Sequence, residues 1–147
     1  MRAVCQRVTE ARVKVDGEVI GEIGSGLVVL LGIERNDEPS EARRLARKVA
    51  QLRIFEDEGG KFAHSLVDTA GAALVVSQFT LLANSRRQKG TRPDFSHAAP
   101  KAQAEPLCDA FCAALHENGV PVQTGIFGAR MALELVNDGP VTIILDT

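Results

Sequence analysis

The chain has 147 residues, of which 45% are hydrophobic and 24% are charged, and its formal net charge is −2. These values are typical of one soluble globular domain spanning residues 1–147, and they exclude a disordered, collagen-like or disulfide-rich chain. The longest apolar stretch is far shorter than the ~18 residues that a membrane-spanning helix needs. Because no secretory core follows the N-terminus and the cysteine count is odd, we expect no membrane association and a cytoplasmic location.

The slightly acidic balance excludes a protein that holds nucleic acid by bulk positive charge alone. One loop is nevertheless locally basic, because residues 84–93 hold several cations and no carboxylate. These cations are Arg86, Arg87, Lys89 and Arg92. Gly90 and Pro93 in the same stretch are typical of a loop. Two interpretations are open for it, an arm that contacts phosphates and a loop that is merely solvated.

Residues 1–35 predict three strands. Val13 and Val15 alternate with charged residues and lead into Asp16-Gly17, a pair that favours a tight hairpin turn into the second strand. The third strand, residues 27–33, is continuously apolar, as a strand buried on both faces would be.

Two amphipathic helices are predicted. The first covers residues 37–52, and its outer face carries Arg43, Arg44, Arg47 and Lys48. These cations could meet phosphate, but a solvated face is the favoured interpretation. The second covers residues 100–118 and is expected to end at Gly119.

The remaining strands complete the predicted fold. Residues 74–82 predict an apolar strand that polar side chains interrupt, and residues 129–136 and 141–145 predict two strands joined by a sharp connection. Strands outnumber helices, and no alternation of strand and helix is visible. We therefore predict an α+β fold with an antiparallel sheet or barrel-like core, flanked by the two main helices.

No metal or cofactor site is expected. Cys108, Cys112 and His116 follow one another at intervals of four residues, but the outer two stand ~12 Å apart along a helix, too far to share one ion. We expect the two thiols to pack in the core. The chain also lacks the serine-hydrolase elbow around Ser77 and any glycine-rich phosphate loop.

Two short segments are chemically unusual. Residues 77–81 read Ser-Gln-Phe-Thr-Leu, and about 60 residues later residues 137–142 read Asn-Asp-Gly-Pro-Val-Thr. Alone, the first could be hydroxyls bonded to nearby backbone and the second an ordinary turn. Together, in this order and at this separation, they resemble the paired signature of the D-aminoacyl-tRNA deacylases. Further similarity lies in residues 6–8, 84–95 and 125–131, so the resemblance spans essentially the whole chain.

Members of that family hydrolyse the ester between a D-amino acid and the terminal adenosine of tRNA, and they also accept glycine, including glycine mischarged on tRNA for alanine. The resemblance therefore implies an obligate homodimer whose partner is the aminoacylated 3′ end of tRNA. It assigns Gly139 and Pro140, joined by a cis peptide, to an element that reaches into the other subunit's pocket. It also implies that Arg7 braces this element and that Met131 contributes to substrate binding. L-amino acids would be rejected by exclusion.

The same resemblance places the pocket, and the catalytic residues, at Ser77, Gln78, Phe79 and Thr80. Backbone N–H groups of Phe79 and Thr80 are candidate donors to the developing oxyanion. Because no base neighbours Thr80 in the sequence, attack by water is favoured over an acyl-enzyme. The resemblance implies that the ribose 2′-hydroxyl assists this attack.

Two alternatives to this function remain open. One is a broader ester or peptidyl-tRNA hydrolase that uses Thr80 or Ser77 covalently. The other is a non-catalytic, dimeric tRNA-binding module whose basic loop is its functional surface.

Overall fold

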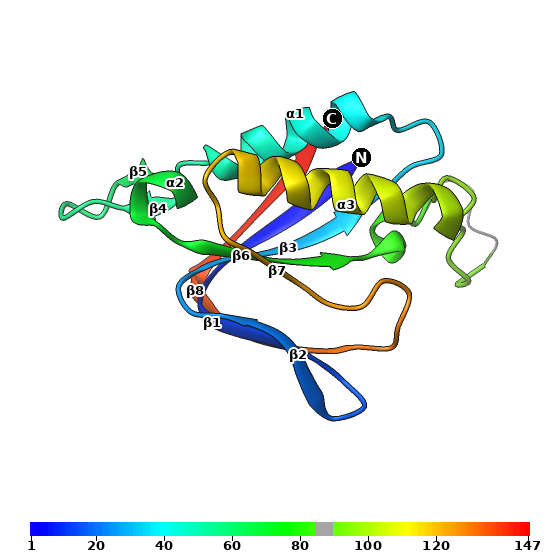
Figure 1. Cartoon of the computed structure of the whole chain (residues 1–147), viewed down its shortest axis with the longest axis horizontal. Helices are drawn as coiled ribbons and strands as arrows, with labels where there is room; N and C mark the ends of the chain where they lie inside the picture. Colours follow the sequence, from blue (N-terminus) through cyan, green and yellow to red (C-terminus); the bar gives the residue numbers. More distant parts are fainter. Residues whose placement is uncertain (85–89) are drawn as a thin grey trace.

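The computed structural model describes residues 1–84 and 90–147 of the chain (Figure 1). Three cations of the predicted basic loop, Arg86, Arg87 and Lys89, lie outside the described residues. The fourth, Arg92, is described and exposed. None of the described helices is long and apolar enough to cross a membrane.

One six-stranded sheet organises the fold. Its strands are β1 (Arg2–Val15), β2 (Glu18–Ile23), β3 (Gly26–Gly32), β6 (Ala72–Ser77), β7 (Val122–Thr124) and β8 (Ala132–Asp146). The order is β2-β1-β3-β6-β7, and β8 pairs with the other edge of β1 along nearly its whole length. The Asp16-Gly17 hairpin between β1 and β2 is confirmed. The sheet bends into a barrel-like shape, as Figure 1 shows.

The predicted antiparallel sheet is wrong for part of the fold, because the sheet is mixed. β3 pairs with β6, and β6 with β7, in parallel. The crossovers pass through α1 (Pro39–Ala50) and α3 (Lys101–Glu117), so strand and helix do alternate in this half of the chain. The continuous apolar character of β3 and β6 is the mark of parallel strands that are covered on both faces. That signal predicts burial correctly, but it leaves strand direction open.

Small elements fill the connections: β4 (Phe55–Glu56), β5 (Phe62–His64), α2 (Leu66–Thr69) and the 3₁₀ turn η1 (Phe79–Leu82). The predicted strand over residues 74–82 is therefore correct only as far as Ser77. β3 ends at Gly32, and the chain passes over this glycine at close range. A Cβ there would lie 3.3 Å from the Gln78 carbonyl oxygen. With no neighbouring strand left, the backbone turns into η1.

The C-terminal segment is one strand of 15 residues, not the two strands predicted. Its pairing with β1 continues past residues 137–140 with register shifts. The Gly139-Pro140 peptide within it is cis, as the resemblance implies, and Gly139 has a φ of +122°. Proline is compatible with this position because β8 is an edge strand of the described sheet, where one row of N–H groups has no acceptor strand.

Both main helices confirm the sequence pattern. α1 begins with a capping box in which the Glu38 N–H donates to the Glu41 carboxylate at 2.9 Å. Its apolar positions are buried and its four basic side chains are exposed, which is compatible with both interpretations of that face, solvation and contact with phosphate. α3 ends before Gly119, which has a φ of +85°.

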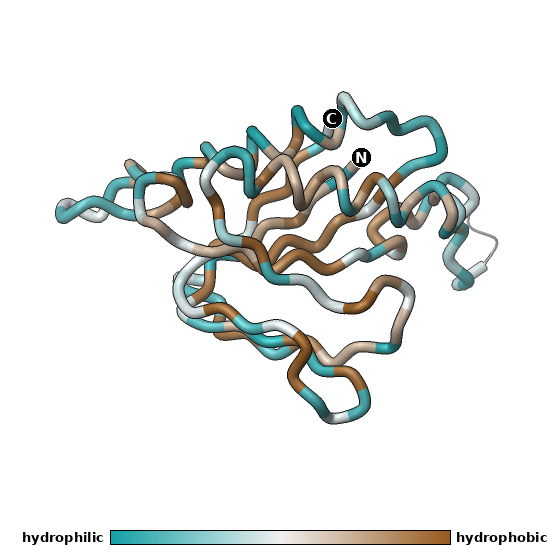
Figure 2. Tube along the Cα trace, viewed as in Figure 1, coloured by the Kyte–Doolittle hydropathy of each residue, from teal (hydrophilic) through white to brown (hydrophobic). Residues whose placement is uncertain are grey.

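Two hydrophobic clusters stabilise the fold. The larger lies between the sheet and the helices α1 and α3, and its biggest fully buried side chain is Phe111. The smaller lies inside the bend of the sheet, where Val13, Val28 and Leu74 meet side chains from β8. Figure 2 shows the apolar colouring concentrated on the central strands and the polar colouring on the outer helix faces and loop tips.

The start of the parallel pairing gives a stability prediction. A Cβ at Gly26 would collide with the carbonyl oxygen of Ala72 on β6, whereas one at Gly24, in the same turn, would meet nothing within 4 Å. We expect Gly26→Ala to lower the free energy of unfolding by about 2 kcal/mol and Gly24→Ala to change it by less than about 0.5 kcal/mol. Urea unfolding measures both, and equal effects would contradict the tight β3–β6 approach.

Candidate active site

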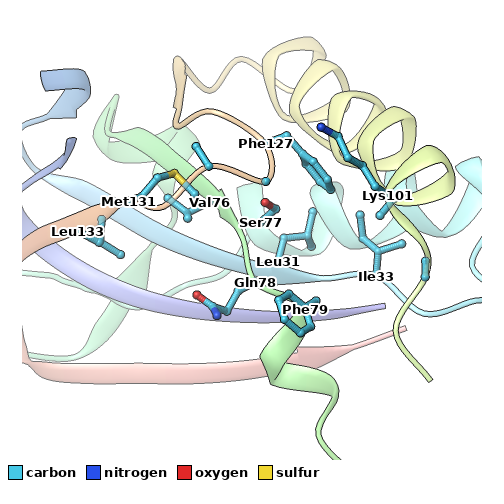
Figure 3. A pocket seen from close by; sticks show the side chains of 14 residues that line it. Leu31, Ile33, Val76, Ser77, Gln78, Phe79, Lys101, Phe127, Met131 and Leu133 are labelled. Atoms are coloured by element: carbon cyan, nitrogen blue, oxygen red, sulfur yellow. The ribbon is translucent and has the colours of Figure 1, made fainter. Parts of the chain in front are cut away.

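A cavity of about 390 Å³ lies where β3 and β6 end. Its floor is apolar, with Leu31 and Ile33 from the end of β3, and Ser77 and Gln78 contribute polar atoms from the end of β6. Figure 3 shows side chains converging on this cavity from η1, from α3 and from the loop before β8. The predicted pocket residues Ser77, Gln78 and Phe79 therefore line one space, together with Met131.

The turn after β6 sets the geometry of the cavity mouth. The Gln78 N–H donates to the Leu31 carbonyl at 2.8 Å, which extends the β3–β6 pairing by one bond. The Gln78 side-chain amide then donates to the Thr80 hydroxyl. Thr80 itself is exposed and is not among the residues that line the cavity. Its only link to the cavity lining among the side-chain hydrogen bonds of the described residues is the one with Gln78.

Two backbone donors remain available at this turn. Phe79 and Thr80 open η1, and N–H groups in the first turn of a helix have no partner within that helix. Within the described part of the chain, no hydrogen bond from either amide to another group is recorded. Unused N–H groups beside a cavity can stabilise a negatively charged oxygen.

Phe127 and Lys101 are two of the cavity residues that were not predicted from the sequence. Phe127 lies within the segment 125–131 that carries the family resemblance. A phenylalanine there could equally be a core residue, so the sequence did not single it out. Lys101 begins α3, where nothing in the local sequence relates it to residues 77–79. Only the tertiary structure brings these two side chains to the same cavity as Phe79, a residue that is 58% exposed.

Arg7 holds the turn that contains Gly139-Pro140. Its side chain is buried, and it donates to the Ile54 carbonyl at 2.8 Å and to the Asp138 carbonyl at 3.2 Å. It also forms ion pairs with Glu56 at 3.2 Å and with the Asp138 carboxylate at 3.1 Å. The predicted bracing of the turn by Arg7 is thus a feature of this structure.

The turn and the cavity are separate within one chain. Gly139 and Pro140 are exposed and do not line the cavity. Arg7 pairs with Leu27, whereas the cavity begins at Leu31, four residues further along β3. At 3.3 to 3.4 Å per residue this is roughly 13 Å along the strand. The predicted site residues therefore form two groups, one at each place.

The thiols of α3 pack as expected. Cys108 is buried in the larger core, and a hydrogen bond to Cys112 together with burial raises the pKa of its thiol. The same bond lowers the pKa of Cys112, while burial alone raises the pKa of Cys5 to about 12. His116 is exposed. Over residues 1–84 and 90–147, no three His, Cys, Asp or Glu side chains are grouped as they would be around a metal ion.

Known proteins resemble this chain over nearly its whole length. The sequence profile of the family described as D-Tyr-tRNA(Tyr) deacylase matches residues 4–146. Curated relatives called D-aminoacyl-tRNA deacylase include one from Roseiflexus sp., 59% identical over all of this chain and 94% of that protein, and one from Thermus aquaticus, 56% identical over all of this chain and 95% of that protein.

Solved structures are similar over the same length. One described as c-Myc DNA Unwinding Element Binding Protein superposes with a TM-score of 0.91 at 44% identity, covering 100% of this chain and 99% of that one. Another, described as a probable eukaryotic D-amino acid tRNA deacylase, has a TM-score of 0.86 at 20% identity over 99% of this chain and 98% of its own, which shows the shared fold.

Proposed function

The chain belongs to the D-Tyr-tRNA(Tyr) deacylase family, and we propose that it hydrolyses the ester bond of D-aminoacyl-tRNA, releasing free tRNA and the D-amino acid. The observation that carries this proposal is the cavity at the ends of β3 and β6, which the exposed Phe79 lines and beside which the chain turns into η1 with the amides of Phe79 and Thr80 unused. Its volume lies in the range typical of small-molecule sites.

The cavity suits the end of a nucleic acid strand. The exposed ring of Phe79 can stack on a base, and Phe127 offers a second apolar surface nearby. Ser77 and Gln78 supply hydrogen-bonding atoms for the ribose and the ester. In this arrangement the terminal adenosine occupies the cavity, and the ester lies beside the amides of Phe79 and Thr80.

The reaction then depends on main-chain groups more than on a side-chain nucleophile. The amides of Phe79 and Thr80 donate to the carbonyl oxygen as it gains negative charge. The Thr80 hydroxyl accepts a bond from Gln78 and has no base beside it in the described structure. Water attacks the ester with assistance from the ribose 2′-hydroxyl, so no acyl-enzyme forms.

Chiral selection is assigned to a second copy of the chain. The Gly139-Pro140 turn lies away from the cavity of its own chain, which supports a role in the cavity of a partner subunit. The turn presents backbone carbonyls that can hold the α-ammonium of the substrate, and its backbone occupies the space where an L side chain would point. Glycine has no side chain to exclude and is accepted.

The basic segment after η1 is proposed to contact the tRNA backbone. Arg92, which belongs to the described part of this segment, is exposed. The positive charges of Arg86, Arg87 and Lys89 would add to its charge. Cations in this position neutralise phosphates and release counterions, which gives binding that weakens as salt rises.

A non-catalytic nucleic-acid-binding module is the second candidate. The DNA-binding name of one similar structure favours it. This candidate predicts binding of tRNA without hydrolysis, whereas the proposed function predicts turnover.

Deacylation of matched substrates tests the function. We expect the protein to release the amino acid from D-tyrosyl-tRNA and from glycyl-tRNA, and to leave L-tyrosyl-tRNA intact, because only an L side chain would collide with the partner's turn. Acid-gel separation of charged from free tRNA measures this. Binding of all three substrates without release would support the non-catalytic module instead.

The role of Thr80 can be separated from that of the substrate. We expect Thr80→Ala to retain a large part of the activity, whereas loss of a covalent nucleophile costs on the order of 10⁴-fold or more. A terminal 2′-deoxyribose should remove most of the rate with the protein unaltered. An inactive Thr80→Ala enzyme, with normal cleavage of the 2′-deoxy substrate by the wild type, would favour Thr80 as nucleophile.

Mixing two inactive variants tests the cross-subunit site. Ser77→Phe fills the cavity, and Gly139→Val displaces the turn, because a Cβ there already crowds Val141. Half of randomly mixed dimers carry both variants, and each of those has one intact site, so about a quarter of wild-type activity should return. Co-expression with two affinity tags isolates the mixed dimers. Mixed dimers as inactive as the parents would show that cavity and turn act within one subunit.

A further inference from the structure

One cation at the cavity has no assigned role. Lys101 is the first residue of α3, and its side chain forms part of the cavity lining. Figure 3 shows it extending from α3 alongside Phe127, with its ammonium beyond the ring. The ammonium lies near Gly128, where an added Cβ would be 3.7 Å from the Lys101 Nζ.

The charge on Lys101 has no partner among the described residues. Neither a hydrogen bond nor an ion pair of this ammonium occurs with the described residues, although eight ion pairs are recorded for them. Among the described residues that line the cavity, Lys101 alone is charged, and no carboxylate is present there. The cavity therefore pairs apolar and aromatic walls with one available positive charge at its edge.

This combination matches a mononucleotide. A nucleoside needs a ring surface and a few hydrogen-bonding atoms, which Phe79, Phe127, Ser77 and Gln78 supply. A nucleotide also carries one phosphate, and a lysine ammonium is a compact cation with three donors suited to it. A ligand held only by its adenosine and its amino acid would leave the Lys101 charge without a partner.

We propose that the ammonium of Lys101 binds the phosphate on the 5′ side of the terminal adenosine and thereby positions the ester against the amides of Phe79 and Thr80. This inference rests on the proposed function. Lys101 is a positioning residue in this scheme, because its ammonium contacts the substrate at a distance from the reacting atoms. The enzyme would consequently bind an aminoacyl ester of the nucleotide better than the same ester of adenosine, which lacks the phosphate.

Two small substrates isolate the phosphate contact. They are the D-tyrosyl ester of adenosine and the same ester of adenosine 5′-monophosphate, which differ only in that phosphate. A hydrogen bond between charged groups should make kcat/KM about tenfold higher for the phosphorylated ester. In Lys101→Gln this preference should disappear through a higher KM with kcat retained, and Lys101→Arg should restore most of it.

Matched variants and outcomes make the test decisive. Lys48→Gln removes an exposed lysine from α1, away from the cavity lining, and should keep the full phosphate preference. A phosphate preference that persists in Lys101→Gln would overturn the inference, as would an equal loss on both esters, which would indicate a structural role in the wall. A wild-type protein that hydrolyses neither the esters nor D-tyrosyl-tRNA would instead overturn the proposed function.

Discussion

Strand β1 has a hydrogen-bonded neighbour on both edges along most of its length, and the positions of both halves of the site depend on this. One edge pairs first with β3 and then with β2, while the other pairs with β8 throughout. Ion pairs join β1 to β8 near both ends. Arg2 lowers the pKa of Asp146, and Lys14 together with Arg12 lowers the pKa of Glu134. The cavity and the Gly139-Pro140 turn are therefore fixed relative to each other by one strand.

Local features of the fold were predictable because local physics determines them. The Asp16-Gly17 turn, the amphipathic face of α1 and the glycine after α3 each depend on residues within a few positions. The parallel pairing of β3 with β6 depends on a crossover of some forty residues, and no short pattern encodes its direction. The end of β6 at Ser77 follows from the end of its neighbour at Gly32, which is again a tertiary effect.

The candidate site divides in the same way. Residues 77–80 and 137–142 were recognisable because the two continuous segments, in this order and at this separation, resemble the signature of a known family, whereas the composition of each alone is compatible with an ordinary strand or turn. Lys101 and Phe127 were missed, since an isolated lysine or phenylalanine carries no signal until folding places it at the cavity that Phe79 also lines. The strand pattern also failed to predict the burial of Arg7. Its place in the strand pattern is compatible with an exposed residue. The structure instead buries its side chain, which donates hydrogen bonds to the carbonyls of Ile54 and Asp138.

The partners of Arg7 give the turn an unbalanced charge. One guanidinium lies between two carboxylates, those of Glu56 and Asp138, and both carboxylates are about half exposed to solvent. The group as a whole is negative by one unit, so the electrostatic potential at this surface favours cations. If the turn binds the aminoacyl group as proposed, this potential would stabilise the protonated, ammonium form of that group. An N-acylated amino acid has no such charge, and this surface offers it no electrostatic gain.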